Sequence, residues 1–265
     1  MKIREIIGAL EDFAPLALQD GFDNSGLQIG LPEDADATGV LLSLDVTEDV
    51  LDEAISLGCN MVISHHPLLF HPLKSVSGKD YVERCVIKAI KNGITLYAAH
   101  TNLDNAPNGV NYRIADKLGL QNIQWLDPKN GLDAGSGIVG TLKSTMHMAD
   151  FVSMVKDVFN VECVRYNDWD GENVHTVAVC GGAGSFLMPK AVELCADAFL
   201  TGEIGYHRFF GYERQMLLME IGHFESEQFT LDILEDVVCN SVCWKKSGNR
   251  PALYKARSSN PIMYR

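Results

Sequence analysis

Residues 40–66 read VLLSLDVTEDVLDEAISLGCNMVISHH, and this stretch decides the fold. Residues 40–46 are rich in Val and Leu, which is typical of a buried strand. Residues 48–57 carry apolar side chains at helical spacing until Gly58 ends the pattern. Residues 61–64 form a second apolar run of strand length. The stretch therefore predicts a β-α-β unit of a mostly parallel or mixed sheet.

A second stretch repeats this pattern. Residues 40–66 align with residues 177–203 without a gap, and the apolar positions coincide. Farther along, residues 94–104 align with residues 217–227, which places His100 on His223 and Asp104 on Glu227. Any two β-α-β units share an apolar pattern by chance, but that pattern does not explain two matching pairs of His and acid. We expect two related halves whose strand ends converge on one crevice, because open α/β sheets bind ligands at the carboxyl ends of strands.

The remaining segments alternate between helix and strand in the same way. Residues 81–91 and 110–118 have helical periodicity, residues 94–99 form a strand, and residues 137–168 show a strand-helix-strand pattern. The expected fold class is α/β, with two related α/β halves, mixed sheets covered by helices and a ligand site in the crevice between the halves. Residues 1–125 form the first half with its N-terminal helix. Residues 126–265 form the second half, with the middle section and a C-terminal strand that returns to its sheet.

The composition is that of an ordinary globular protein, with 265 residues of which 46% are hydrophobic and 22% charged. The net charge of −13 makes a nucleic-acid backbone or an anionic membrane surface an unfavourable partner. Acidic residues interrupt the apolar N-terminal segment, which predicts an amphipathic helix over residues 1–20 instead of a signal peptide. No apolar run approaches the ~18 residues of a spanning helix. We therefore expect a cytoplasmic protein.

The seven Cys fit a cytoplasmic location, because they are odd in number and scattered along the chain. Cys239 and Cys243 stand four residues apart in a helical pattern. We interpret this pair as one apolar helix face in preference to a zinc-binding pair.

Adjacent histidines follow the second strand of the first stretch, in Ser64-His65-His66-Pro67. Neighbouring strand residues point to opposite faces, so both imidazoles can aim at one place only where the strand gives way to a loop. Pro67 ends the strand there by removing the next backbone donor. Taken alone, such a pair is more often a polar strand end than a metal site.

Two further segments each leave an apolar strand, present an imidazole and offer a carboxylate one helical turn later: His100 with Asp104, and His223 with Glu227. Each pair alone is equally well explained as a strand-end His and an acid near a helix N-terminus, where the dipole favours its charge. Together with the adjacent histidines they exceed what one tetrahedral ion uses. The count favours two divalent metal ions, and mixed imidazole and carboxylate ligands suit Zn, Fe, Mn, Ni or Co.

The second half has Glu203 and His207 where the first half has its adjacent histidines. These two residues and His100 are candidates for acid–base work beside the metals or for supporting the ligands. For Glu203 and His207, a strand-end acid and an interface His are the structural alternative. Residues 179–185, VCGGAGS, form a glycine-rich turn that could cradle an anion, although they match neither a P-loop with Lys nor a Gly-x-Gly-x-x-Gly fingerprint.

Six ordered motifs resemble the successive signatures of the NIF-three-like proteins, which are also called GTP cyclohydrolase I type 2 homologues. The motifs are Asp23-Asn24-Ser25-Gly26-Leu27-Gln28-Ile29-Gly30, Ser64-His65-His66-Pro67, His100-Thr101-Asn102-Leu103-Asp104, Gly181-Gly182-Ala183-Gly184-Ser185, Thr201-Gly202-Glu203 with His207, and Gly222-His223 with Glu227. They extend in order over nearly the whole chain, which makes the resemblance specific.

The resemblance implies a two-domain α/β protein that assembles as a toroidal homohexamer around a dinuclear metal centre. It carries metal-ligand roles onto five residues and places His100, Glu203 and His207 close by. The five are His65, His66, Asp104, His223 and Glu227, with Glu227 as the bridge between the ions. Many relatives have an inserted middle domain, but the segment between Leu120 and Val174 is too short here to hold that domain beside the expected strands. The chain therefore resembles the short form.

Two classes of function fit these residues. In the first, two metals activate water for hydrolysis of a nucleotide, such as ring opening of GTP at C8, or of a phosphoester. In the second, the protein is a non-catalytic metal-binding hexamer that acts as an adaptor or as a metal-storage or regulatory protein. Unused acid–base groups around the ligands favour the enzyme, because a purely structural site is closed by tight ligands.

Overall fold

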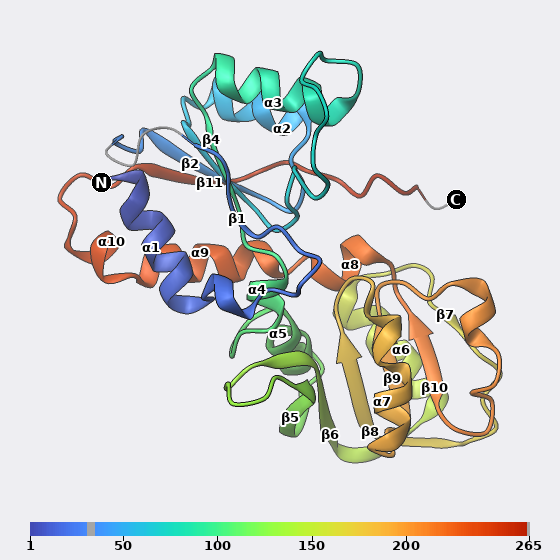
Figure 1. The fold of residues 1–265 in the computed structure, drawn as a ribbon. Helices are drawn as coiled ribbons and strands as arrows, with labels where there is room; N and C mark the ends of the chain where they lie inside the picture. The colour runs from blue at the N-terminus through green and yellow to red at the C-terminus, as the bar shows by residue number, and fades with distance from the viewer. Residues whose placement is uncertain (31–34, 264–265) are drawn as a thin grey trace. The chain divides into compact units, whose positions relative to one another are not determined.

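The computed structural model describes residues 1–30 and 35–263. The chain divides into two compact units, of which the first comprises Met1–Leu103 and Thr230–Arg265 and the second comprises Asp104–Phe229. Figure 1 follows the chain through both units. None of the described helices is long and apolar enough to cross a membrane.

A five-stranded mixed sheet forms the centre of the first unit, in the order β1-β4-β3-β2-β11. Its strands are β1 (Gly26–Ile29), β2 (Gly39–Ser43), β3 (Met61–Ser64), β4 (Thr95–Ala98) and β11 (Ala252–Lys255). Neighbouring strands are parallel except for β1 and β4. Every residue of β2, β3 and β4 is buried, as expected for parallel strands that are covered on both faces.

Helices cover both faces of this sheet (Figure 1). α2 (Glu48–Ser56) and α3 (Tyr81–Lys91) lie on one face, and α1 (Ile3–Phe13), α9 (Thr230–Asn240) and α10 (Val242–Lys246) lie on the other. Leu51 of α2 and Val86 of α3 belong to one buried cluster with Leu41, Val62 and Leu96 of the strands. α4 (Thr101–Asp104) is a single turn that follows β4.

The second unit contains a six-stranded mixed sheet, in the order β5-β6-β8-β9-β10-β7. Its strands are β5 (Gln121–Pro128), β6 (Gly135–His147), β7 (Arg165–Tyr166), β8 (Asn173–Cys180), β9 (Ala198–Thr201) and β10 (Leu217–Glu220). β8, β9 and β10 run parallel, and the other three strands pair antiparallel. This is the predicted combination of mixed sheets and helices.

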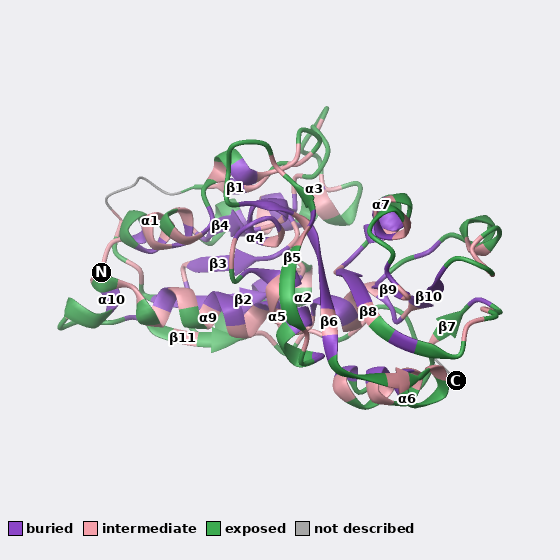
Figure 2. Cartoon of the chain, turned by 90° about the horizontal axis from the view of Figure 1, so that it is seen from below, coloured by how far each residue is buried: buried purple, intermediate pink, exposed green. Residues whose placement is uncertain are grey.

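The helices of the second unit are α5 (Val110–Lys117), α6 (Met148–Phe159), α7 (Met188–Glu193) and α8 (His223–Glu227), with short 3-10 turns η2 (Gly184–Leu187) and η3 (Tyr206–Phe209). Met188 and Ala191 of α7 pack with Ala178, Phe199 and Leu218 of the sheet. Figure 2 shows that the central strands are largely buried, whereas the helices alternate between buried and exposed positions. The cores therefore lie between sheets and helices.

The two units share one β-α-β pattern with the same strand register. Val40 pairs with Met61 in the first sheet, and Val177 pairs with Ala198 in the second. The predicted alignment places Val40 on Val177 and Met61 on Ala198, so this part of the internal repeat is confirmed. His65 and Gly202 consequently follow corresponding strands, β3 and β9.

The next strand of the repeat differs from the expected alignment by one residue. Thr95 pairs with Met61, and Leu217 pairs with Ala198, so Leu217 corresponds to Thr95 and not to Ile94. The extra residue of the second unit precedes His223. It is Gly222, whose φ of 98° suits glycine and turns the chain into α8.

The C-terminal segment belongs to the first unit, and not to the second half as the sequence analysis expects. β11 pairs parallel with β2, with Leu253 opposite Val40. Strand pairing with the open edge of β2 satisfies backbone groups that would otherwise face solvent. A short strand carries no signal in its own residues for which sheet it joins, and the boundary at residues 125 and 126 accordingly differs from the units of the structure.

Two local expectations also change. The N-terminal helix ends at Phe13 rather than near residue 20, and Pro15 precedes a separate 3-10 turn. Cys239 lies in α9 and Cys243 in α10, because the Ser241 side chain caps a new helix by accepting a hydrogen bond from Trp244 N. The two Cys therefore do not share one helix face.

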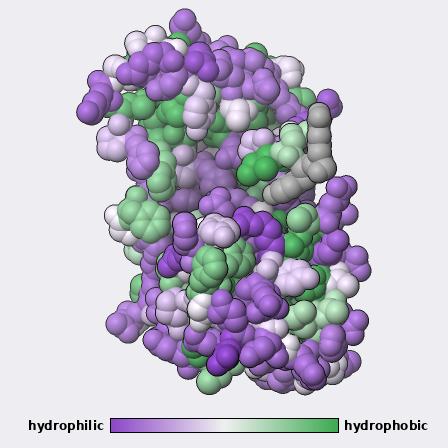
Figure 3. All heavy atoms as spheres, turned by 90° about the vertical axis from the view of Figure 1, so that its right-hand side faces the viewer, coloured by the Kyte–Doolittle hydropathy of each residue, from purple (hydrophilic) through white to green (hydrophobic). Residues whose placement is uncertain are grey.

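Hydrophilic side chains predominate on the molecular face that Figure 3 shows, and hydrophobic groups occupy smaller areas between them. Among the large hydrophobic residues that remain exposed are Phe22, Tyr206 and Phe210. Single exposed apolar side chains are ordinary, whereas apolar rings that line a pocket indicate a ligand.

Candidate metal centre

The first group of site residues forms where β3 ends. The backbone N–H groups of His65 and His66 donate to Ser43 O at 3.0 Å and to Leu44 O at 2.8 Å, which continues the pairing with β2 beyond the strand. Ser64 Oγ donates to His66 O at 2.8 Å and holds the turn. This local geometry brings both imidazoles together, with ring centroids 4.9 Å apart.

His100 follows β4 and joins the same group. Its ring centroid lies 5.3 Å from that of His65 and 5.5 Å from that of His66. Each of the three residues offers one ring nitrogen, and these nitrogens lie within 4.8 Å of one another, as a shared metal ion requires. The structure thus brings together three residues that the sequence analysis selects from two strand ends.

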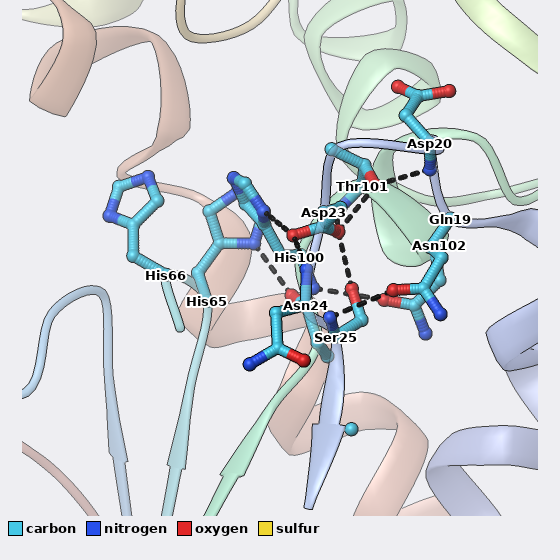
Figure 4. Close-up of polar contacts among 12 residues, drawn as sticks. Gln19, Asp20, Asp23, Asn24, Ser25, His65, His66, His100, Thr101 and Asn102 are labelled. Carbon is cyan, nitrogen blue, oxygen red and sulfur yellow. Dashed lines mark hydrogen bonds and ion pairs between the residues drawn. The ribbon is translucent and has the colours of Figure 1, made fainter. Parts of the chain in front are cut away.

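Asp23 fixes the orientation of His100. His100 Nδ1 donates to Asp23 Oδ1 at 2.7 Å, and Thr101 N and Ser25 Oγ donate to Asp23 Oδ2 at 3.1 and 2.6 Å (Figure 4). Burial alone would raise the pKa of the Asp23 carboxyl, but the hydrogen bonds from His100, Ser25 and Thr101 outweigh it and hold that pKa well below its usual range. Asp23 is therefore a fully buried carboxylate.

All four histidines of the two groups use Nδ1 in the same way. His65 donates to the Ala99 carbonyl at 2.8 Å, His66 to Asp45 at 2.9 Å, His100 to Asp23 at 2.7 Å and His223 to Glu203 at 2.8 Å. Because carboxylates and carbonyls only accept, Nδ1 must carry the proton, which leaves the lone pair of each neutral ring on Nε2. Metal-binding histidines are held in this way, with one nitrogen donating outward and the other facing the ion.

The second group forms where α8 begins. His223 is the first residue of α8, and Glu227 lies one turn later with its side chain 4% exposed. His223 Nε2 and Glu227 Oε2 are 3.2 Å apart. Glu203, which follows β9, receives the Nδ1 hydrogen bond of His223 and is 56% exposed. The predicted pair therefore sits side by side, and Glu203 supports it.

Two glycines make room for this group. A Cβ on Gly182 would meet Glu227 Oε1, and φ at Gly182 is +61°. A Cβ on Gly202 would lie 2.6 Å from Ser226 Oγ and 2.9 Å from His223 Cα. The turn after β8 and the end of β9 can therefore pack against α8 only where both positions lack a side chain.

Three amides of the glycine-rich turn, which could have met an anion, donate to side chains of the protein instead. Gly181 N donates to Asn111 Oδ1 at 3.0 Å, Gly182 N donates to Ser226 Oγ at 2.9 Å, and Gly184 N donates to Thr201 Oγ1 at 3.0 Å. These donors hold the turn against its neighbours. These three amides are therefore not available to an anion in this conformation.

Asp104 and His207 are the remaining two residues that the sequence predicts for the site. Asp104 is the last residue of α4, one helical turn after His100, and its carbonyl accepts from Asn111 Nδ2 at 3.1 Å. His207 is exposed in η3, with its ring centroid 5.1 Å from that of Tyr206. The roles predicted for Asp104 and His207 stay predictions.

The family described as Duf34/NIF3 (NGG1p interacting factor 3) matches residues 1–246. The chain belongs to the Duf34/NIF3 family. A Clostridium acetobutylicum protein named GTP cyclohydrolase 1 type 2 homolog is 31% identical, with 100% of this chain and 99% of the relative covered. The protein of that name from Clostridium perfringens is 36% identical over 86% of this chain and 87% of its own length.

Solved structures agree with this membership. A hypothetical protein of Staphylococcus aureus has a TM-score of 0.88 at 28% identity, with 100% of this Duf34/NIF3 chain and 99% of that chain covered. A Bacillus cereus protein related to NIF3 has a TM-score of 0.86 at 25% identity, with 100% and 99% covered. The alignment with a Staphylococcus epidermidis relative extends over 370 positions against 265 residues here, in accord with the short form. Family and fold are confirmed.

Asp45 is a supporting residue of this Duf34/NIF3 protein that the sequence analysis misses, and Asp23 enters that analysis only within a family motif. Asp45 lies two residues beyond β2, and Ser43 of β2 pairs with Ser64 of β3. An acid just past a strand end, beside a neighbouring strand that ends in His, is a signal that could have identified Asp45. Asp23 offers no such signal, because it lies 77 residues from His100 in an irregular segment.

Proposed function

We propose that this Duf34/NIF3 protein is a metal-dependent hydrolase with two divalent ions per chain, drawn from Zn, Fe, Mn, Ni and Co. The proposed ligands are His65, His66, Asp104, His223 and Glu227, with Glu227 shared between the ions. The proposed substrate is a nucleotide, opened as the relatives' name GTP cyclohydrolase suggests, or a phosphoester. We further propose that the protein is a cytoplasmic homohexamer.

The observation that carries this proposal is the common use of Nδ1 by all four histidines. Holding four rings by an outward hydrogen bond fixes their Nε2 lone pairs before any ion binds, and ordering those side chains in advance favours binding. A cluster of histidines that served only packing or solubility would have no reason to share one tautomer. The shared tautomer therefore supports the proposal of a resident metal.

The number of proposed ligands supports two ions instead of one. The proposed set has five side chains, whereas one tetrahedral ion uses four ligands. A carboxylate shared between two ions accommodates such a set.

Divalent ions in such a site supply Lewis-acid activation of water at neutral pH. In our proposal His100 is not a metal ligand: Asp23 holds its ring, and its free Nε2 lone pair would accept and return the proton beside the ions. Glu203 orients His223 and offers a partly exposed carboxylate for a second proton transfer, and His207 acts on the leaving group. Acid–base groups of this kind contribute about 10²- to 10⁴-fold to a rate.

The test measures metal and turnover separately. Metal content of untagged protein is determined by mass spectrometry, and nucleotides and phosphoesters are then screened with each candidate metal restored. Glu227→Gln should lose most of the metal, whereas Glu203→Gln, which keeps an oxygen that accepts from His223, should retain metal and lose turnover. Glu193→Gln, on the exposed end of α7, is the matched control and should change neither.

The outcomes separate the proposal from its alternative. Two metals per chain with no turnover on any substrate class would favour a non-catalytic adaptor, storage or regulatory protein. Retention of both metals by Glu227→Gln would remove the bridging role. Light scattering that shows a monomer at micromolar concentration would remove the hexamer.

A further inference from the structure

A pocket of about 410 Å³ opens beside His100 in the first unit. Its wall comes from two segments that also hold site residues: the segment around Asp23, and the loop that continues from His65 and His66. The residues that shape it are Phe22, Asn24, Leu69, Phe70, His71 and Leu73. A volume of this size is typical of a small-molecule site.

Aromatic rings form much of this pocket and lead toward the metal centre. The centroids of Phe22 and Phe70 are 6.4 Å apart in an edge-to-face arrangement. Phe70 also lies 4.9 Å from the ring of His71 and 6.0 Å from the ring of His100. Phe22 is 66% and Phe70 37% exposed, so two large apolar surfaces face a hollow that a flat ligand could cover.

Hydrogen bonds hold the two walls together. Asn24 Nδ2 donates to Leu69 O at 2.7 Å, and Leu69 N donates to Gln28 Oε1 at 3.2 Å. Gln28 Nε2 in turn donates to Asn24 O at 2.6 Å. Because the two segments are tied to each other, the pocket is formed before a ligand arrives, which reduces the entropy cost of binding.

The polar groups of the pocket select the kind of ring. With Nδ2 of Asn24 used by Leu69 and Gln28, the Oδ1 atom accepts no hydrogen bond from the described residues and can serve a ligand donor. His71 offers a second polar group. No Lys or Arg is among the described residues that line the pocket, and Asp23 is already saturated with donors. The lining therefore suits an uncharged ring with an N–H or amino donor and does not suit a phosphate.

We propose that this pocket binds the planar nitrogen-heteroaromatic ring of the substrate, of the nucleobase class, against Phe70 and Phe22 and with a donor to Asn24. The ring would then lie next to His100, where the proposed hydrolysis takes place. Only that last placement rests on the proposed function, since ring binding itself needs no metal.

The test titrates full-length, metal-free protein with guanosine, purine riboside and inorganic triphosphate by calorimetry. Guanosine should bind, and Phe70→Ala should raise its dissociation constant about tenfold or more, because stacking on an aromatic side chain is worth that much. Phe70→Tyr, which keeps the ring, should bind like the wild type, and so should Phe210→Ala, an exposed aromatic residue of the second unit. Purine riboside, which lacks the donors of guanine, should bind more weakly, and triphosphate should not respond to Phe70→Ala.

If wild type and Phe70→Ala bind guanosine equally, or if neither binds it, the proposed ring-binding role of the pocket is wrong. If purine riboside binds as tightly as guanosine, the proposed hydrogen bond from the ligand to Asn24 is wrong. A change in association state of Phe22→Ala and Phe70→Ala in sedimentation velocity, without a change in guanosine binding, would identify the surface as a contact between copies. Metal analysis distinguishes the two proposals. If the protein binds guanosine but takes up no metal, the proposed metal-dependent hydrolysis is wrong and the proposed ring-binding pocket still holds.

Discussion

Asp23 accepts the Nδ1 proton of His100 at 2.7 Å across 77 residues of sequence. Asp45 stands in the same relation to His66 across 21 residues, and His65 reaches the Ala99 carbonyl in place of a carboxylate. The oriented imidazoles are thus a property of the folded unit and not of any local motif. Their orientation should persist without metal.

The first prediction concerns the tautomers of these rings. In metal-free protein near pH 7, nitrogen NMR of the neutral rings should show Nδ1–H for His65, His66, His100 and His223. His147 is an internal control with the opposite expectation, because its Nδ1 accepts from Ala149 N at 3.2 Å and the proton must lie on Nε2. A mixture of tautomers at the four site histidines, with His147 as expected, would contradict preorganisation.

The second prediction tests the space that Gly182 leaves for Glu227. Gly182→Ala should displace the Glu227 carboxylate and lower metal content sharply, and it should also lower the free energy of unfolding. Gly119→Ala is a matched control with φ of +67° and open space around its Cβ. That control should cost about 1–2 kcal/mol from the left-handed backbone alone and leave metal content unchanged. Equal metal content in both variants would contradict the steric role.

Much of this arrangement could be predicted from the sequence, because it depends on local periodicity. The boundaries of β3 and α3 match the expected residues 61–64 and 81–91, because a short apolar run determines the first and helical spacing that ends before Gly93 determines the second. His65 and His66 could be selected because a strand end followed by Pro leaves few other places for two imidazoles. The family motifs then identified the fold as a whole.

Long-range pairing explains what could not be predicted. β11 pairs with β2 although most of the chain separates the two strands, and no feature of residues 252–255 predicts which strand they pair with. The one-residue offset at Gly222 is likewise invisible until strand register is known. Asp23 had no assigned role for the same reason, because its function is to accept from a side chain that only the tertiary structure brings near.

The third prediction is a pH dependence of stability centred on Glu83. Burial alone would raise the pKa of this carboxyl, but hydrogen bonds from Ser77, Ser75 and Lys79 N lower it from 4.5 to about 2. Because the pKa of Glu83 is lower in the folded protein than in the unfolded chain, its ionised carboxylate stabilises the fold at pH values above 4.5. This contribution is lost as the pH falls from about 4.5 toward 2. Urea unfolding should therefore show Glu83→Gln less stable than wild type at pH 7, with a gap that narrows below pH 4.5.

Glu193→Gln serves as the comparison for Glu83, because its carboxylate makes only an exposed i,i+3 ion pair with Lys190. Its unfolding midpoint should follow the wild type at every pH. A gap for Glu83→Gln that stays constant between pH 7 and pH 3.5 would mean that the loss comes from packing and not from the charge.

The last prediction concerns Asp45, the acceptor that holds His66. Because Asp45 is 48% exposed, its removal should leave the fold intact and change the orientation of the His66 ring. Asp45→Ala should weaken metal binding about 10- to 100-fold, the usual effect of removing a carboxylate behind a metal-binding histidine. Asp45→Asn, whose side-chain oxygen can still accept from Nδ1, should retain most of the affinity. Asp49→Ala, in the first turn of α2, removes the same charge a few residues away and should bind metal like the wild type. Competition with a chelator gives all three affinities. Equal weakening by Asp45→Ala and Asp49→Ala would assign the effect to net charge, and only a loss specific to Asp45→Ala supports orientation of His66.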